Sequence, residues 1–430
     1  MSHTIFAVSS GSPPAAIAVV RISGPQALAA AAVLTERLPE ARTPVLRKLR
    51  DPKSGLLLDQ ALVLRFDAPA TATGEDLVEL HLHGGRAVVA AVLAALEKLD
   101  GLRAAEPGEF TRQALTNGRI DLTEAEGLGD LLAAETESQR RAAITAAEGA
   151  IGRMVHDWSA RTVALSARTE AQIDHSDEDD VGDEGDAAAI RAEMKTLAEE
   201  IARVLAEPPV ERLRDGIRVV LAGPPNSGKS TLLNRLVGRD AAIVSPIAGT
   251  TRDRIEAPVS RGGIAYLFTD TAGLRADGED AIEVIGMTRA REAVESADVL
   301  LWLGDDDMPL VEGPIRIALH PRCDVEGRKP PRGRLAISAE TGSGIEALWD
   351  AIASAAQGRL PTLDRPALNA RQRILADEAL VWLKTGVAES DMILVGESLR
   401  AARQAFDRIT GRADVEAMLD SLFSRFCIGK

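Results

Sequence analysis

Residues 217–230 read Ile-Arg-Val-Val-Leu-Ala-Gly-Pro-Pro-Asn-Ser-Gly-Lys-Ser, and this stretch decides how the middle of the chain folds. The apolar run Ile217–Ala222 is typical of a buried strand, and helix-forming residues follow Ser230. Between them lies a glycine-rich loop of the kind whose backbone N–H groups converge on phosphates. In such a loop Lys229 places a positive charge at the β and γ phosphates, and Ser230 offers its hydroxyl to Mg²⁺.

The sequence around this loop alternates short apolar runs with helical stretches as far as Pro361. Such a pattern is typical of a largely parallel sheet with helices on its faces. The runs that we expect to be strands are Ile217–Ala222, Ile264–Thr269, Val299–Leu303, Ile315–Leu319 and Arg334–Ile337. We therefore predict an α/β P-loop domain over residues 215–360.

Two further motifs distinguish a GTP site from an ATP site. Thr250 and Thr251 lie in Gly-Thr-Thr-Arg-Asp, where a threonine can complete the Mg²⁺ shell and sense the γ-phosphate. A predicted strand then runs into Asp-Thr-Ala-Gly, where Asp270 would support the metal and the Gly273 N–H would meet the γ-phosphate. These motifs stand in the order typical of GTP-hydrolysing proteins, each at a strand end.

The base-reading segments are partly altered. Ser338 and Ala339 follow the last predicted strand, as the base-contacting loop of GTPases does. The usual guanine-reading Asn-Lys-x-Asp is replaced by Pro-Arg-Cys-Asp, so that Pro321 and Arg322 stand at the first two positions. Asp324 can still accept hydrogen bonds from the N1 and N2 groups of guanine. We therefore expect GTP binding with altered base selectivity or affinity.

The position that usually orients the attacking water is apolar. Leu274 directly follows Asp-Thr-Ala-Gly, where small GTPases place a glutamine. Leucine cannot orient water, so another polar group must do so. The nearest supply is the acidic stretch that contains Glu279, Asp280 and Glu283.

The rest of the chain divides by composition. Residues 1–118 mix apolar runs such as Ile17–Ile22 and Ala61–Phe66 with Pro and Gly and an Ala/Leu stretch over 86–99, which predicts an α+β domain. Residues 119–210 and 365–430 are rich in helix formers. We therefore predict a multidomain chain whose all-α helical domain has two separated segments, with the α/β domain inserted between them.

One acidic run interrupts the first helical segment. Residues 174–186 contain eight carboxylates among thirteen residues, with glycines between them. Such a run is most simply a solvated loop, and the alternative is a site for a metal or a basic partner.

Composition and charge exclude several classes of protein. The formal net charge of −15 argues against a protein that wraps nucleic acid with a broad basic face, so any RNA contact should be local or shared with a partner. The two cysteines cannot form a disulfide framework. No apolar run approaches the roughly 20 residues of a membrane span, and no secretory leader is evident. These features predict a cytoplasmic protein with no membrane partner.

Several short motifs together resemble one family. They are Val-Arg-Ile-Ser-Gly at 20–24, Gly-Glu-Asp at 74–76, Glu-Leu at 79–80, His-Gly-Gly at 83–85, Pro-Gly-Glu-Phe-Thr at 107–111, Asn-Gly-Arg-Ile-Asp-Leu at 117–122, the GTPase motifs, and Phe-Cys-Ile-Gly-Lys at 426–430. With these motifs the chain resembles, over essentially its whole length, the MnmE (TrmE) family of tRNA modification GTPases. The terminal motif and Gly-Thr-Thr-Arg-Asp are much more specific than a P-loop.

The resemblance implies an activity and its partners. It implies a homodimer formed through an N-terminal domain that binds 5-formyl- or 5,10-methylenetetrahydrofolate. It also implies an FAD-dependent partner, MnmG (GidA), in a heterotetramer or larger complex that acts on tRNA. Together the proteins would add an aminomethyl-type group to C5 of wobble uridine. GTP hydrolysis would be stimulated by K⁺ and by pairing of two GTPase domains.

The resemblance also assigns roles to single residues. Arg21, Glu79 and Arg119 would contact the folate, Arg119 replacing a frequent lysine. Glu283 would orient the attacking water through a bridging water, and Cys427 matches a cysteine essential to modification.

The complete prediction for the ligand sites has two parts. Ser230 and Thr251 are expected to bind Mg²⁺, and Asn226, Ser245, Ile247 and Thr250 to bind K⁺, the last three in part through main-chain oxygens. The residues expected to bind cofactors are Arg21, Glu79, Arg119, Asn226, Ser227, Gly228, Lys229, Ser230, Thr231, Ser245, Pro246, Ile247, Ala248, Gly249, Thr250, Thr251, Asp270, Thr271, Ala272, Gly273, Asp324, Ser338, Ala339 and Lys430.

Two other functions remain open at this point. A switch GTPase of ribosome assembly would share the P-loop and switches but would need an RNA-binding appendage with a basic or aromatic surface. A one-carbon-transfer enzyme with merely regulatory GTP would bind folate and show no effect of GTP on its product.

Overall fold

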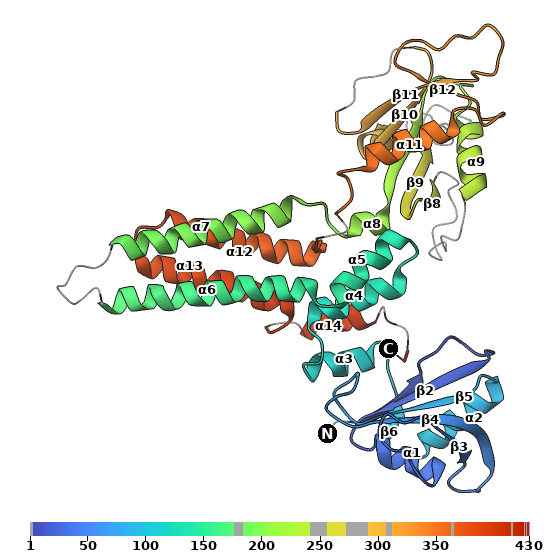
Figure 1. Ribbon diagram of the computed structural model, residues 1–430, viewed down its shortest axis with the longest axis vertical. Coiled ribbons are helices and arrows are strands. Elements are labelled where there is room, and N and C mark those ends of the chain that lie inside the picture. The colour runs from blue at the N-terminus through green and yellow to red at the C-terminus, as the bar shows by residue number, and fades with distance from the viewer. Residues whose placement is uncertain are drawn as a thin grey trace, which may run out of the picture. The chain divides into compact units, whose positions relative to one another are not determined.

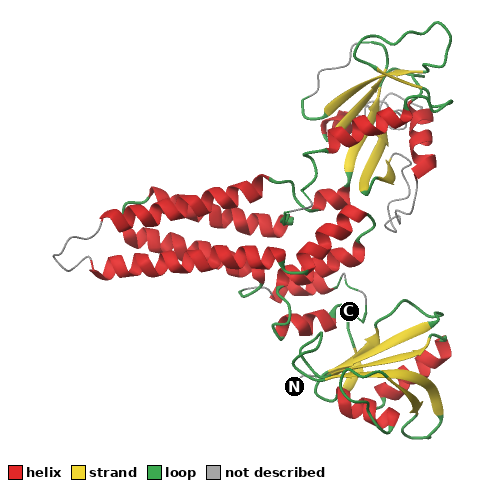
Figure 2. Ribbon diagram, in the orientation of Figure 1, coloured by secondary structure: helices red, strands yellow, loops and turns green. Residues whose placement is uncertain are grey.

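The structure is a computed structural model, and it describes residues 3–175, 184–240, 256–271, 291–306, 312–362, 365–413, 416–424, 426 and 428–429 (Figures 1 and 2). These residues belong to two compact units, one made of Met1–Gly129 with Asp407–Lys430 and the other of Asp130–Phe406. Among the described helices, none combines the length and the apolar character needed to cross a membrane.

The first unit contains a six-stranded sheet. Its strands are β1 (Thr4–Val8), β2 (Ile17–Ser23), β3 (Val45–Arg50), β4 (Leu57–Phe66), β5 (Leu77–His83) and β6 (Leu102–Ala104), in the order β3-β4-β5-β2-β1-β6. All neighbours are antiparallel except β1 and β6. Side chains alternate along the strands, so residues such as Val20, Val63 and Leu80 are buried with α1 (Ala27–Thr35) and α2 (Arg86–Glu97). The α+β prediction is therefore confirmed.

The last residues of the chain pack against the first strand within the same unit, which also holds α3 (Glu109–Thr116), α14 (Glu416–Phe423) and most of α4 (Leu122–Ala133). Ser9 Oγ donates a hydrogen bond of 2.8 Å to the Gly429 carbonyl, and Ile428 forms a β-bridge with Pro107. Gly429 has φ 96°, and a Cβ there would lie 2.0 Å from the Val8 carbonyl oxygen. The terminal Phe-Cys-Ile-Gly-Lys motif thus requires glycine at this position.

The second unit contains the helices α5 (Glu137–Ala147), α6 (Ala150–His175), α7 (Glu184–Ala206), α8 (Glu211–Asp215) and α12 (Ala370–Ala388), and most of α13 (Met392–Thr410). The helical segment predicted over residues 119–210 is broken by a capping box at Thr136 and by Gly149, which has φ 79°. The helices α6 and α7 include residues 174–175 and 184–186, so the acidic loop is shorter than predicted. Residues 176–183 lie outside the described part.

The α/β part of the second unit is inserted between two helices that pack on each other, α7 and α12. The chain leaves the helical part and returns to it at neighbouring points. The Val210 N–H donates to the Leu368 carbonyl over 3.3 Å there. Arg373 adds hydrogen bonds of 2.8 and 2.6 Å to the carbonyls of Glu207 and Leu205.

The α/β part contains the second six-stranded sheet. Its strands are β7 (Ile217–Ala222), β8 (Glu256–Arg261), β9 (Ile264–Asp270), β10 (Val299–Leu303), β11 (Ile315–Pro321) and β12 (Leu335–Ile337), in the order β12-β11-β10-β7-β9-β8, and its helices include α9 (Lys229–Asp240) and α11 (Ile345–Ala356). The five predicted strands are confirmed. An additional strand, β8, pairs antiparallel with β9 across the tight turn Gly262-Gly263.

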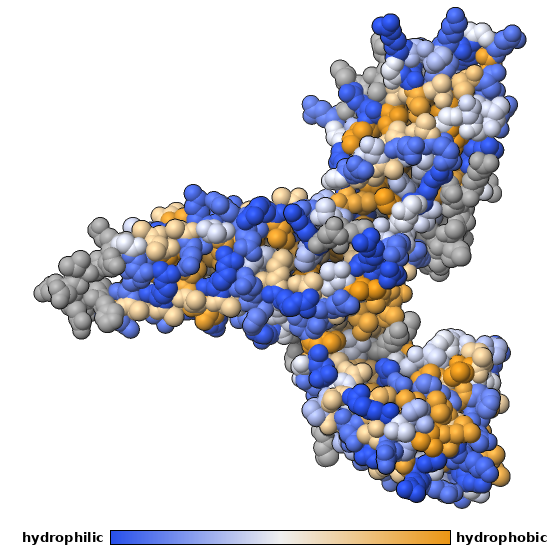
Figure 3. Space-filling view, in the orientation of Figure 1, coloured by the Kyte–Doolittle hydropathy of each residue, from blue (hydrophilic) through white to orange (hydrophobic). Residues whose placement is uncertain are grey.

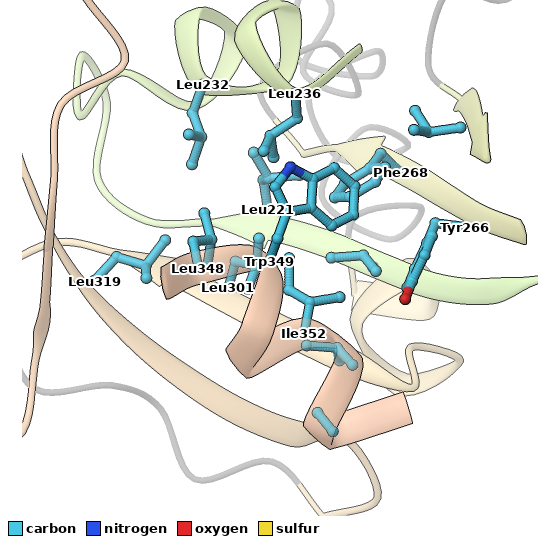
Figure 4. Packing of buried hydrophobic residues seen from close by; sticks show 14 of the residues in the cluster. Leu221, Leu232, Leu236, Tyr266, Phe268, Leu301, Leu319, Leu348, Trp349 and Ile352 are labelled. Atoms are coloured by element: carbon cyan, nitrogen blue, oxygen red, sulfur yellow. The ribbon is translucent and has the colours of Figure 1, made fainter. Parts of the chain in front are cut away.

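An aromatic cluster under this sheet fixes the strands (Figure 4). The Trp349 ring of α11 meets Tyr266 and Phe268 of β9 edge to face, with ring centroids 5.4 and 5.5 Å apart. Leu221 and Leu301 from β7 and β10 are fully buried in the same cluster. Because neighbouring parallel strands share this core, their carboxyl ends are held together at one edge of the sheet, where ligands bind in open α/β sheets.

Candidate functional site

The loop after β7 has the backbone shape that a phosphate-binding loop needs. Gly223 has φ 149°, and a Cβ at this position would lie 2.3 Å from the Leu303 carbonyl oxygen of β10. Gly228 has φ 95° directly before α9, which begins at Lys229. Only glycine fits these two positions at low cost. The backbone N–H groups of the loop therefore lie beside the N-terminus of α9. A helix N-terminus attracts anions, so the two together can bind phosphate.

The Lys229 side chain folds back beneath this loop. It is buried, and its Nζ donates to the carbonyls of Gly223 over 3.1 Å and Pro224 over 2.8 Å. A buried ammonium needs such oxygen partners, and phosphate oxygens supply the same chemistry. The geometry therefore places one positive charge at the loop that would wrap a nucleotide phosphate.

A hydroxyl and a carboxylate meet beside this lysine. Ser230 Oγ, on the first turn of α9, donates to Asp270 Oδ2 over 2.5 Å, and Asp270 is buried at the end of β9. The next residue, Thr271, donates through N and Oγ1 to the Leu221 carbonyl, which fixes the strand end. Two hard oxygen donors beside a phosphate-binding loop fit Mg²⁺, which takes few protein ligands and completes its shell with phosphate and water.

A cavity of about 160 Å³ lies between the phosphate loop and the loops after β11 and β12. Its lining includes Ser227, Thr231, Asp324, Ser338 and Ala339, all of which the sequence predicted for nucleotide binding. The nearby Ser338 hydroxyl is the main cause that holds the pKa of the Asp324 carboxyl below its ordinary value. Asp324 is therefore kept ionised, as an acceptor of guanine N–H groups must be.

Arg322 links the base-reading loop to the phosphate loop, a contact that sequence reasoning missed. Its Nη2 donates to the Asn226 carbonyl over 2.7 Å. Both residues have positive φ values, 58° for Arg322 and 61° for Asn226. The sequence feature that could have indicated this contact is the cation at the lysine position of the altered guanine motif. The arginine thus keeps the charge at that position, with Pro321 before it.

Base selectivity provides a test of this pocket. Replacing Asp324 with asparagine should shift preference from GTP toward XTP by about 10-fold or more, because an amide can donate to the xanthine oxygen where a carboxylate only accepts. Competition binding of GTP, XTP and ATP to wild type and variant measures the shift. Glu326→Gln, which neutralises an exposed acid of the same loop, is the matched control. An unchanged GTP/XTP ratio in Asp324→Asn would contradict this role.

Part of the expected site lies outside the described residues. This part comprises Ser245, Pro246, Ile247, Ala248, Gly249, Thr250, Thr251, Ala272, Gly273, Glu283, Cys427 and Lys430, together with Leu274, Glu279 and Asp280. Their assigned roles stay predictions.

In the first unit, Arg21 and Glu79 are brought together on the sheet. They are direct cross-strand neighbours in β2 and β5, and Arg21 Nη2 donates to Glu79 Oε1 over 2.8 Å. His81 Nε2 lies 3.4 Å from the other oxygen, Glu79 Oε2. The Arg21 guanidinium also lies 5.7 Å from the centroid of the Phe110 ring. The pair is half-buried, so it forms a polar site with an aromatic wall.

Arg119 follows α3 and is held against the loop that precedes β5. Its Nε donates to the Thr71 carbonyl over 3.1 Å, and Asn117 Nδ2 donates to the Thr73 carbonyl over 2.7 Å. Thr73 in turn is hydrogen-bonded to Ser23 of β2 over 2.7 Å. Among the described residues, no hydrogen bond or ion pair joins Arg119 to Arg21 or Glu79, so the structure brings together two of the three predicted folate contacts and leaves Arg119 at the Thr71 loop.

Comparisons with known proteins agree over the whole chain. A family model for the MnmE helical domain matches residues 122–427, and one for the GTP-binding protein TrmE N-terminus matches residues 4–119. The chain is 55% identical to the tRNA modification GTPase MnmE of Rhizorhabdus wittichii, covering 100% of this chain and 97% of that one. It is 53% identical to the MnmE of Erythrobacter litoralis, with 100% of both covered. With this identity over the full length, the chain belongs to the MnmE family of tRNA modification GTPases.

Proposed function

We propose that this GTP-hydrolysing enzyme of tRNA modification acts with an FAD-dependent partner of the MnmG (GidA) type. Together they would use a tetrahydrofolate one-carbon unit to add an aminomethyl-type group to C5 of wobble uridine. The observation that carries the proposal is a GTP site and a separate polar site in one chain of this family. The first comprises Lys229, Ser230, Asp270 and Asp324, and the second is built on Arg21 and Glu79.

In the nucleotide site each described residue has a distinct task. Guanine would enter the cavity beside Asp324, while Ala339 and Ser338 form its wall. The phosphates would lie against the loop before α9, where Lys229 contributes positive charge. Arg322 holds the base-reading loop against the phosphate loop, so base and phosphates are positioned together.

Two cations belong to this proposal. Mg²⁺ would be held by the Ser230 hydroxyl with Asp270 in support and Thr251 completing the shell. K⁺ would be held by Asn226 together with Ser245, Ile247 and Thr250. Asn226 fits, because its side chain is exposed in a left-handed backbone and makes no hydrogen bond to any other described residue. When bound, these ions would supply positive charge to the phosphates, and Glu283 would orient water.

The folate would bind in the first unit. An aminopyrimidine ring presents N–H groups that a carboxylate such as Glu79 can accept, and its flat ring can stack beside Phe110. Arg21 donates a hydrogen bond of 2.8 Å to Glu79 and can also meet an anionic ligand group. Arg119 would approach from the loop of Thr71. The donor would be 5-formyl- or 5,10-methylenetetrahydrofolate.

The assembly implied by this function has several members. The N-terminal unit would pair two copies of the chain, and the GTPase parts of the two copies would pair during hydrolysis. The FAD-dependent partner and tRNA would complete a heterotetramer or larger complex in the cytoplasm. Cys427 would take part in the modification.

The proposal is tested by reconstitution. Purified protein, the FAD-dependent partner, methylenetetrahydrofolate, an ammonium source, K⁺, Mg²⁺, GTP and an unmodified tRNA transcript are combined, and nucleosides are analysed by mass spectrometry. A modified wobble uridine that requires both GTP and folate is the expected result. Product formed equally without GTP would favour a one-carbon-transfer enzyme. Absence of product together with GTP-dependent binding to ribosomal subunits would favour the ribosome-assembly alternative.

The folate site has its own test. Replacing Arg21 with alanine should weaken tetrahydrofolate binding about 10- to 100-fold and leave GTP binding unchanged, because one charge-assisted hydrogen bond is worth roughly 1.5–3 kcal/mol. Titration calorimetry with each ligand measures both affinities. Lys48→Ala, an exposed cation on β3 at the edge of the same sheet, is the control with the same charge change. Equal folate affinity in Arg21→Ala and wild type would remove Arg21 from the site.

A further inference from the structure

The loop between β11 and β12 is basic in a chain that is acidic overall. Its cations are Arg322, Arg328, Lys329, Arg332 and Arg334, and its acids are Asp324 and Glu326. The loop therefore carries an excess of positive charge, while the whole chain has a net charge of −15. In Figure 1 the loop extends beyond the ends of these two strands, and Figure 3 shows hydrophilic surface over this end of the domain.

Two of the arginines anchor the loop at both ends of its basic part. Arg328 Nη2 donates to Asp305 Oδ2 over 2.7 Å, and Arg334 donates to the carbonyls of Gly304 and Asp306. The buried His320 lies 2.6 Å from Asp305 Oδ1, and its hydrogen bond is the main cause that lowers the pKa of Asp305. These two arginines are thus bound to residues 304–306, the segment that follows β10.

The tip between the two anchors is presented to solvent. Lys329, Pro330, Pro331 and Arg332 are all exposed. Gly327 and Gly333, with φ of 85° and 80°, turn the chain on either side of them. The prolines restrict the backbone, so less conformational entropy is lost when this tip binds a partner. Lys329 and Arg332 make no hydrogen bond or ion pair with any other residue that the structure describes.

We propose that the tip formed by Lys329–Arg332 contacts the phosphate backbone of tRNA. This inference rests on the proposed function, in which tRNA is the substrate. Free lysine and arginine side chains on a restrained loop are suited to phosphate contacts, which position RNA without reading its sequence. Protein interfaces instead centre on aromatic or aliphatic anchors and are poor in lysine, and this tip offers no such anchor. In a chain that otherwise repels RNA, local cations of this kind dominate the attraction.

The proposed RNA contact lies on the same loop as the guanine-reading Asp324 but outside the nucleotide cavity. Asp324 and the tip belong to the same loop. Arg328 precedes the tip in the sequence and Arg334 follows it, directly before β12, and both arginines contact the segment after β10. RNA bound at the tip would therefore touch the loop that reads guanine without entering the nucleotide cavity, whose lining does not include Lys329 or Arg332.

The test measures tRNA binding as a function of salt. The double variant Lys329→Ala/Arg332→Ala should bind an unmodified tRNA transcript about 10-fold or more weakly at low salt. The slope of log K against log salt should decrease in magnitude by about 1.5–2, because two phosphate contacts are lost. Fluorescence anisotropy at several KCl concentrations gives both values. GTP affinity and GTP hydrolysis without tRNA should stay at wild-type values.

Two controls make the result specific. Lys195→Ala/Lys384→Ala removes the same charge from two exposed lysines on α7 and α12 and should leave the slope unchanged. Lys329→Arg/Arg332→Lys keeps both charges and should bind like wild type.

Each remaining outcome would overturn the inference in a recognisable way. Wild-type affinity and slope in the alanine variant would remove the tip from the RNA contact. Unchanged tRNA binding with weakened binding of the FAD-dependent partner would make the tip a protein contact instead. Failure of the wild-type protein itself to bind tRNA, alone or with its partner, would instead contradict the proposed function, and the inference with it.

Discussion

Replacing Lys229 with alanine should reduce GTP turnover by about 100-fold or more while the protein stays folded. The ammonium lies beneath the phosphate loop, 3.1 and 2.8 Å from two of its carbonyls, and would stabilise negative charge that develops on the phosphates. Loss of one such preorganised donor typically costs a factor of 10²–10³ in rate. Ser230→Ala should have a comparable effect, because it removes the hydroxyl that meets Asp270 and would hold Mg²⁺.

Single-turnover hydrolysis and circular dichroism on the same preparations check this expectation. Lys384→Ala, which removes an exposed lysine of the same unit, should hydrolyse GTP at the wild-type rate. A folded Lys229→Ala protein with wild-type turnover would show that hydrolysis takes place elsewhere in the chain.

Exchanging K⁺ for Na⁺ should slow GTP hydrolysis strongly, by about 10-fold or more. No cis arginine stands out by sequence motif as the source of charge between the β and γ phosphates, so a monovalent cation held by Asn226 and residues 245–250 would supply it. A loop sized for K⁺ cannot close equally well around the smaller Na⁺. Rates measured in KCl and NaCl at equal ionic strength decide the matter, and equal rates would remove the cation from the mechanism.

The same assay separates the cation from the water-orienting group. Glu283→Ala should slow the chemical step and leave GTP affinity nearly unchanged, because its contact acts mainly on the transition state. Leu274 cannot take over this role. Glu279→Ala tests the other glutamate of the same acidic stretch, and a wild-type rate in Glu283→Ala would mean that another residue holds the water.

Much of the α/β fold could be predicted because its strands are short apolar runs with clear ends. The strand β8 could not, since Glu256–Arg261 has few apolar residues and contains Pro258. An edge strand tolerates proline and polar residues because only one side of it is paired. The tertiary ladder with β9, and not the composition of the segment, makes it a strand.

In the nucleotide site, too, the residues of sequence motifs could be predicted, whereas the contacts that depend on the folded backbone could not. Lys229, Ser230 and Asp270 could be predicted because each holds a fixed place in a motif at a strand end. The bond from Arg322 to the Asn226 carbonyl could not, because it depends on left-handed backbone conformations in two loops that are far apart in sequence. Likewise, Ser338 was expected near the base, but its position beside Asp324 depends on the packing of β12 beside β11.

The hydrogen bond between Val210 and Leu368 holds the two ends of the inserted GTPase part side by side. Since both ends of the excursion meet at one point, a short glycine-rich linker can replace residues 211–367 without separating α7 from α12. The helical protein and the excised GTPase could then be produced as independent proteins. The same closeness would let a GTPase from another relative be grafted at this point, giving chimaeras in which nucleotide turnover and tRNA modification are exchanged separately.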